Sequence, residues 1–174
     1  MKARLIVGYL VASLTLLAAP ALAQDRQDQR LADEIAANVR TYSRFSIFDH
    51  VSGRVEDGVV VLTGKVTMPY KKQDIERSIA TVDRVREVRS EITVLPVSIH
   101  DDELRYRISR AIYGNPTFWN YAAMANPPIH IIVENGRVTL TGVVFSNVER
   151  MMARSLATGL GEFSVTNNLR TEMK

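Results

Sequence analysis

The chain has no cysteine among its 174 residues. Disulfides, thiol chemistry and the attachment of a lipid to a cysteine are therefore excluded. Its three histidines, His50, His100 and His130, stand far apart and have no acidic partner at ligand spacing. Because a metal site in a protein needs several donors that converge, the sequence predicts no metal site.

Motifs for catalysis are also missing. No Gly-x-Ser-x-Gly sequence occurs, which disfavours a serine nucleophile. Gly64 and Gly142 recur at equivalent places and are interpreted as structural positions, not as a phosphate-binding loop. Asp101 and Asp102 precede a predicted helix, where acidic residues favour the N-terminal dipole. We therefore expect no enzyme activity and no cofactor.

Long apolar runs are scarce as well. The one that is present covers residues 5–19, and Lys2 and Arg4 precede it. At about 15 residues it is shorter than the roughly 20 that a membrane-spanning helix needs, and small residues follow it. This arrangement is typical of a secretory signal peptide. The sequence therefore predicts a signal peptide over residues 1–23, cleaved before Gln24, and an exported mature chain without a membrane anchor.

The chain has little excess charge of either sign. Its formal net charge is +3, from 22 basic and 19 acidic residues. Lys2 and Arg4 leave with the predicted signal peptide, so 20 basic residues remain against 19 acidic ones, a net charge of +1. Binding to nucleic acid depends on many contacts between basic side chains and phosphates. A nearly balanced, exported chain is therefore not expected to bind nucleic acid.

What the sequence does contain is an internal repeat. Residues 51–66, VSGRVEDGVVVLTGKV, return at residues 129–144 as IHIIVENGRVTLTGVV, a shift of 78 residues. Each copy alternates apolar residues on both sides of an Asp-Gly or Asn-Gly pair, and such pairs suit the tight turn of a β-hairpin. The pattern predicts two antiparallel strands in each copy. We interpret Gly64 and Gly142 as positions where another element, a helix, comes close to the strand.

Apolar residues at helical spacing flank each hairpin. A helix is predicted before the hairpin and another after it, and a strand with alternating apolar residues ends each copy. Each copy therefore reads helix, strand, strand, helix, strand. The apolar stripe of the first helix is Leu31, Ile35 and Val39 in copy one and Leu104, Ile108 and Ile112 in copy two; that of the second helix is Ile75, Ile79 and Val82, then Ala153, Ala157 and Leu160.

The repeat predicts an α+β fold of two tandem α-β-β-α-β units, each a small three-stranded mixed sheet packed by two helices. The predicted domains are residues 24–96 and residues 97–174. A unit of about 70 residues buries only about 60% of its surface and is marginally stable alone. The linker, residues 95–98, is short and is stiffened by Pro96. We therefore expect the two units to contact each other.

These patterns resemble the BON domain. The resemblance rests on the order of elements, on the hairpin V-x-D/N-G-x-V-x-L-x-G-x-V, and on the ending V-x-x-V-x-x-x-I/L-x-V at residues 85–94. Copy two has Phe163 where copy one has Val85, and copy one lacks the asparagine that copy two keeps as Asn168. The resemblance implies an exported bacterial protein that binds anionic phospholipid at the cell envelope. Because the chain has no lipid anchor, it is similar to the soluble, osmotically induced periplasmic members, and we expect it in the periplasm.

The two copies differ in length at one place. The first helices are related by a shift of 73 residues and the hairpins by 78, so copy two has five extra residues between them. They fall in residues 115–128, NPTFWNYAAMANPP, which hold the aromatic residues Phe118, Trp119 and Tyr121. Three interpretations stay open. The rings close the core, or Trp119 enters a membrane interface with Tyr121 and Met124, or the rings contact another protein.

Basic residues gather on the predicted helices. Most such charges are expected to be solvated, but a cluster of them would attract anionic lipid headgroups. The hypothetical lipid-binding site combines the aromatic residues with arginines of the preceding helix: Phe118, Trp119, Tyr121, Arg105, Arg107 and Arg110. Further basic residues on the two other helices are Lys71, Lys72, Arg150 and Arg154.

Two functions remain as hypotheses. The first is a peripheral module that docks on an anionic phospholipid surface of the cell envelope. The second is a soluble, chaperone-like factor that binds envelope proteins during osmotic or envelope stress. Weak self-association between copies is compatible with either function.

Overall fold

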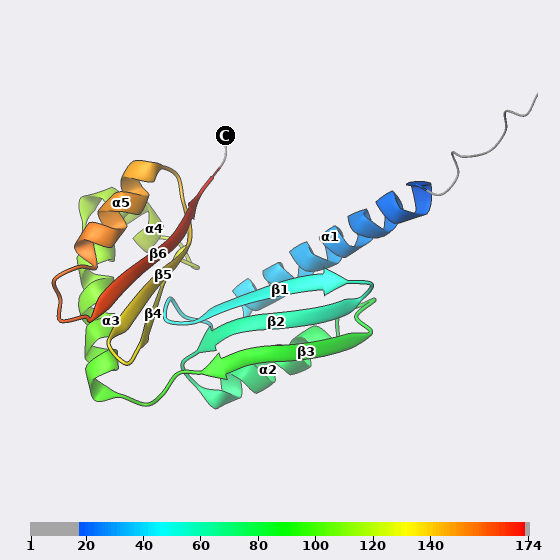
Figure 1. Ribbon diagram of the computed structural model, residues 1–174, viewed down its shortest axis with the longest axis horizontal. Coiled ribbons are helices and arrows are strands. Elements are labelled where there is room, and N and C mark those ends of the chain that lie inside the picture. The colour runs from blue at the N-terminus through cyan, green and yellow to red at the C-terminus, as the bar shows by residue number, and fades with distance from the viewer. Residues whose placement is uncertain (1–17, 173–174) are drawn as a thin grey trace, which may run out of the picture.

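A computed structural model describes residues 18–172 of the chain (Figure 1). Most of the predicted signal peptide, residues 1–17, lies outside the described residues. The helix α1, Ala18–Thr41, continues across the predicted cleavage point. Within residues 18–172, no helix combines the length and the apolar character that a membrane crossing requires.

The chain forms the two tandem α+β units that the repeat predicts. In each unit the second helix connects the hairpin to a third strand, which pairs in parallel with the second strand of the hairpin. The sheet orders are β1-β2-β3 and β4-β5-β6. Domain 1 consists of α1, β1 (His50–Glu56), β2 (Val59–Val66), α2 (Pro69–Ala80) and β3 (Glu87–Val94); domain 2 consists of α3 (Ile99–Tyr113), the short 3-10 helix η1 (Pro116–Phe118), α4 (Trp119–Ala122), β4 (Ile129–Glu134), β5 (Arg137–Val144), α5 (Asn147–Leu156) and β6 (Ser164–Thr171).

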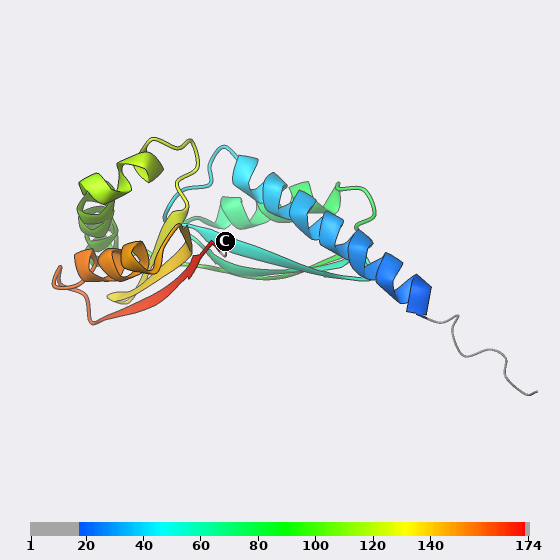
Figure 2. The same cartoon turned by 90° about the horizontal axis from the view of Figure 1, so that it is seen from above.

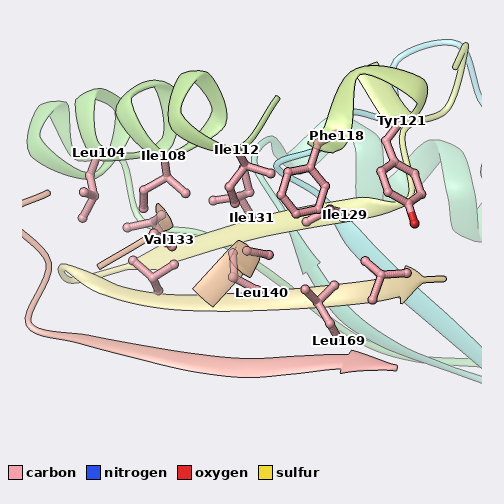
Figure 3. Packing of buried hydrophobic residues seen from close by; sticks show 14 residues of the cluster. Leu104, Ile108, Ile112, Phe118, Tyr121, Ile129, Ile131, Val133, Leu140 and Leu169 are labelled. Carbon is pink, nitrogen blue, oxygen red and sulfur yellow. The ribbon is translucent and has the colours of Figure 1, made fainter. Parts of the chain in front are cut away.

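Each sheet has one face covered by helices and one face without them (Figures 1 and 2). The apolar stripes predicted for the helices lie on the covered face, where they form one core per domain. Figure 3 shows α3 over β4 and β5, with its side chains directed at the sheet. Strands contribute alternate residues because successive side chains point to opposite faces. The core of domain 2 includes Leu104, Ile108, Ile112, Ile129, Ile131, Val133, Leu140 and Leu169.

A carboxylate of the first helix holds each hairpin turn. Asp101, buried in the first turn of α3, accepts hydrogen bonds from the backbone N–H groups of Asn135 (2.7 Å) and Gly136 (2.8 Å). Asp28 of α1 accepts from the N–H of Asp57 in the same way, at 3.0 Å. The sequence predicts only that Asp101 favours the N-terminus of the helix. In the structure, its carboxylate also binds the backbone of the hairpin turn.

Gly64 and Gly142 do not make room for a helix, which corrects the expectation from the sequence. Their φ angles are 136° and 119°, and a Cβ atom at either position would collide with the carbonyl oxygen of His50 or Pro128. The close approach is therefore within the hairpin, to the start of its first strand. Glycine is needed because it adopts this backbone conformation without strain and leaves the carbonyl group room.

A buried ion pair links the loop before β1 to α2. Asp49 is fully buried and accepts hydrogen bonds from Lys71 Nζ (2.6 Å), from Ser46 and from Thr67. Burial disfavours the Asp49 carboxylate, but these hydrogen bonds outweigh burial and hold its pKa below the ordinary value. Lys71 is thus an exception to the solvated helix charges expected from the sequence, since its side chain reaches inward to Asp49.

The domains contact each other, as the short linker predicts. The N–H of Ile131 in β4 donates to the carbonyl oxygen of Ile47 at 2.7 Å. A segment of domain 1 therefore covers part of the edge of the second sheet. Lys65 of β2 forms an ion pair with Glu134 of β4. These contacts place the beginning of β1 and the end of β2 beside β4.

Two histidines face each other in this interface. The ring centroids of His50 and His130 are 5.9 Å apart. The ring centroids of Phe45 and His130 are 5.6 Å apart. Burial, His130 and Arg170 together lower the pKa of His50 to about 4. Burial also lowers the pKa of His130, although the nearby Asp49 opposes this effect. Both rings are therefore uncharged at neutral pH.

Replacing Lys71 with Met should destabilise the protein by about 3 kcal/mol, because it leaves the Asp49 carboxylate buried without its partner. Urea unfolding followed by circular dichroism measures the change. Lys72→Met is the matched control, since Lys72 is partly exposed and its contact with Glu76 is a surface pair worth less than about 0.5 kcal/mol. Equal losses in the two variants would contradict a structural role for the buried pair.

Mild acid should separate the domains. A histidine released from the interface has a pKa near 6.5, and the docked rings have lower values. Docking is therefore favoured above pH 6.5 and weakens as the pH falls through 6.5 toward 4. At about pH 5, where ordinary carboxylates stay mostly ionised, we expect the docking equilibrium to shift by about tenfold.

Spin labels on Gln73→Cys and Thr158→Cys would report the distance between the domains, since the chain has no other cysteine. The distance distribution should broaden between about pH 7.5 and about pH 5. His50→Gln should reduce this response, because glutamine does not titrate and only His130 then contributes. A distribution in the unaltered histidine background that does not change with pH would disprove the mechanism.

Candidate functional site

The five extra residues of the second unit fall in residues 115–128, here called the insertion, which contain η1 and α4 and join α3 to β4. The Asn115 side chain accepts a hydrogen bond from the N–H of Thr117 at 3.0 Å and caps η1, while Pro116 occupies a position where no N–H is needed. In Figure 3 this segment lies beyond the end of α3 and over the same sheet. The insertion, residues 115–128, therefore extends the helical layer of domain 2.

Two of the three aromatic residues of the insertion point into the core. Phe118 is fully buried, and Tyr121 is 2% exposed (Figure 3). The Tyr121 hydroxyl donates to Oε2 of Glu149 at 2.7 Å and accepts from the N–H of Phe145 at 2.9 Å. Burial and Glu149 raise the pKa of Tyr121 to about 12, so the hydroxyl stays protonated. These two rings close the core, and neither presents a surface to a membrane.

Trp119 points the other way. Its side chain is 63% exposed, because residues two apart in a helix lie on different sides of it. Met124, just after α4, is also exposed. The structure therefore leaves Trp119 and Met124 as apolar side chains of the insertion that another molecule can reach.

The three arginines of α3 have different surroundings. Arg105 is only 3% exposed; its guanidinium donates to the carbonyl oxygen of Val133 at 2.6 Å and pairs with Asp102. Arg105 therefore ties α3 to β4 and does not present its charge to solvent. Arg107 and Arg110 are exposed. Of the six residues in the predicted lipid-binding site, the structure brings Trp119, Arg107 and Arg110 to the surface.

A groove connects α3 with the insertion. It has a volume of about 370 Å³, and its walls include Arg110 and Tyr113 of α3 and Ala122 and Pro127 of the insertion. The exposed guanidinium of Arg110 and the exposed side of α4 therefore belong to neighbouring parts of one surface.

The outer side of α5 was not predicted from the sequence. Val148 and Met151, three residues apart, are 69% and 68% exposed, although a helix of a small domain normally turns such residues inward. The buried residue within α5 is the small Ala153, and Ala157, which caps the end of the helix, is also fully buried. The signal was present in the sequence, because apolar residues occupy both sides of this helix.

Two arginines of α5 lie near the exposed side chains of Val148 and Met151. Arg150 and Arg154 of α5 line a groove of about 500 Å³ together with Met151. Within residues 18–172, none of the ion pairs includes Arg107, Arg110, Arg150 or Arg154.

The exposed side chains of α3, α4 and α5 together define the helical surface of domain 2. All three helices belong to the layer that covers one face of the second sheet (Figures 1 and 2). In the part of the chain that the structure describes, no three His, Asp or Glu side chains converge as metal ligands. The surface instead combines apolar and cationic groups: Trp119, Met124, Val148, Met151, Arg107, Arg110, Arg150 and Arg154.

Comparison with solved structures gives only weak similarity. Two structures of CdsD, a structural protein of the type III secretion system of Chlamydia trachomatis, align with 14% identity. The first, its C-terminal domain, has a TM-score of 0.34 over 84% of this chain and 67% of that chain; the second has a TM-score of 0.33 over 82% and 62%. Values this low support no inference about function.

No curated protein matches the chain. The family model of the BON domain, in contrast, matches it twice, at residues 27–96 and 100–173. The two matches cover both α-β-β-α-β units and agree with the hairpin and strand motifs that the two copies share. The chain therefore belongs to the BON domain family.

Proposed function

We propose that the protein is a non-enzymatic periplasmic protein that attaches peripherally to anionic phospholipid of the cell envelope through the helical surface of domain 2. BON domains are generally non-enzymatic, and the family is associated with phospholipid binding and osmotic stress in the periplasm. The observation that carries the proposal is that exposed apolar side chains lie on one helical layer with arginines that have no ion-pair partner among residues 18–172.

The chemistry of this surface suits the boundary between headgroups and acyl chains. A tryptophan ring prefers the headgroup level, because its body is apolar and its N–H is polar. Trp119 therefore supplies an anchor, and Val148 and Met151 supply further apolar area. Each arginine near an anionic membrane contributes about 1 kcal/mol, weakened by salt.

Neither type of group is sufficient alone. Stable peripheral attachment needs two signals, such as apolar insertion and a basic patch. The helical surface of domain 2 provides both from rigid elements. We therefore expect reversible binding that depends on anionic lipid and on ionic strength.

A second candidate function is supported by the same exposed methionines. Met side chains are flexible and polarisable, so they adapt to differently shaped apolar partners. Met151, Met124 and Trp119 would then bind exposed segments of envelope proteins, which is a chaperone-like role for a soluble factor. Such binding should be insensitive to the charge of added lipid.

Flotation with vesicles separates the two functions. The purified chain should float with anionic vesicles at low salt and remain at the bottom with neutral vesicles or at high salt. Arg150→Gln with Arg154→Gln should weaken the affinity for anionic vesicles about thirtyfold, because two contributions of about 1 kcal/mol are lost. The matched control is Arg54→Gln with Arg86→Gln, which changes the net charge equally in domain 1. Failure to float with anionic vesicles at low salt would reject lipid binding.

Trp119 provides a direct optical probe, since it is the single tryptophan. Its emission in the free protein should be that of a solvent-exposed indole, and anionic vesicles should shift it to the blue as the ring enters the interface. Neutral vesicles should leave the emission unchanged. A spectrum that is already blue-shifted without vesicles would mean that the ring is buried, contrary to this surface.

A further inference from the structure

A cleft lies on the opposite side of domain 2, between the open face of its sheet and domain 1. Its volume is about 410 Å³, within the range of about 300–1,000 Å³ that is usual for small-molecule sites. Domain 1 contributes His50, Gly64 and Lys65, and strands β4, β5 and β6 contribute the remaining wall. The cleft therefore exists only while the two domains are docked.

Apart from Arg137, the wall formed by β5 and β6 is polar and uncharged. Thr139 pairs with Thr166, and Thr141 pairs with Asn168, in the parallel register of these strands. Their side chains lie on the open face, because Val138 and Leu140 between them are buried in the core. Four hydroxyl or amide groups therefore form a two-by-two array, with neighbouring strands about 4.8 Å apart.

Among the described residues, these polar side chains have no hydrogen-bond partner. Within residues 18–172, the hydrogen bonds formed by side chains include none from Thr139, Thr141, Thr166 or Asn168. A folded protein normally pairs its polar groups or leaves them to water. Each of these groups can therefore exchange water for a hydroxyl group of a ligand without losing a bond within the protein.

The remaining lining carries little free charge. Lys65 is paired with Glu134, and burial lowers the pKa of His50, so its ring is neutral at neutral pH. Arg137 is the other charged side chain among the described residues that line the cleft, and Arg170, which helps to lower the pKa of His50, lies near it. A polyanion would find more cationic partners on the helical surface than here.

One apolar side chain completes the cleft. Ile132 of β4 lines it and is buried although it lies on the open face of the sheet. An apolar contact surrounded by hydroxyl and amide groups matches a sugar ring, which has C–H faces and hydroxyl edges. Neutral polar groups that fix orientation and an apolar floor are the usual parts of a ligand site.

We propose that the cleft between the domains binds an uncharged glycan. The hydroxyl and amide groups of β5 and β6 exchange hydrogen bonds with the sugar hydroxyls, and Ile132 supports a C–H face of the ring. The site lies on the side of the second sheet that faces away from the helical surface of domain 2. A glycan and a lipid surface would therefore be bound on opposite sides of one domain, and the glycan site does not depend on the proposed lipid binding.

NMR titration of the isotopically labelled full chain tests the proposal with three probes. Chitotetraose represents N-acetylhexosamine glycans, maltotetraose represents plain hexose glycans, and inorganic phosphate represents a small anion. One of the two oligosaccharides should shift the backbone amides of β5 and β6 with a millimolar or lower dissociation constant. The stronger of the two identifies the class of glycan, and phosphate should cause no shift there.

Variants assign the binding to the array. Thr141→Val and Thr166→Val keep the shape and strand preference of threonine but remove a hydroxyl, so each should weaken binding about fivefold or more. Thr63→Val is the matched control, because Thr63 of β2 occupies the position in domain 1 that Thr141 occupies in domain 2. The absence of shifts with both oligosaccharides, shifts confined to the helices, a response to phosphate alone, or equal weakening by Thr63→Val would each overturn the proposal.

Discussion

The rest of the molecule depends on the packing of helices on one face of each three-stranded sheet. The apolar stripes of the helices and the inward residues of the strands form one small core per unit. Units of this size are marginally stable alone because they bury a limited fraction of their surface. This explains why the two units dock, and why the face without helices is free to contribute to a cleft between them.

The same packing gives domain 2 two chemically different sides. On the helical side, Ala153 and Ala157 let α5 lie close to the sheet, while Val148 and Met151 remain outside. On the other side, the sheet presents hydroxyl and amide groups beside domain 1. The apolar and cationic groups thus face away from the neutral polar groups, so that one small domain can contact two kinds of partner.

Buried charges are where sequence reasoning was least successful. Lys71 and Arg105 look like ordinary charges of exposed helix faces, yet both are buried in the structure. Burying a charge is costly unless a partner compensates for it, and the partners come from distant segments: Asp49 lies 22 residues from Lys71, and the carbonyl group of Val133 lies 28 residues from Arg105. Spacing along the chain cannot show such partners.

The sequence by itself determined the two α-β-β-α-β units, their hairpin turns, the core stripes of the helices and the place of the insertion. These features depend on periodicity and turn chemistry, which act over a few residues. Only the tertiary structure decided that Phe118 and Tyr121 face the core while Trp119 faces solvent, and that His50 meets His130 between the domains. The direction of a side chain in a four-residue helix, and the contacts across a domain interface, depend on how distant segments pack and not on local pattern.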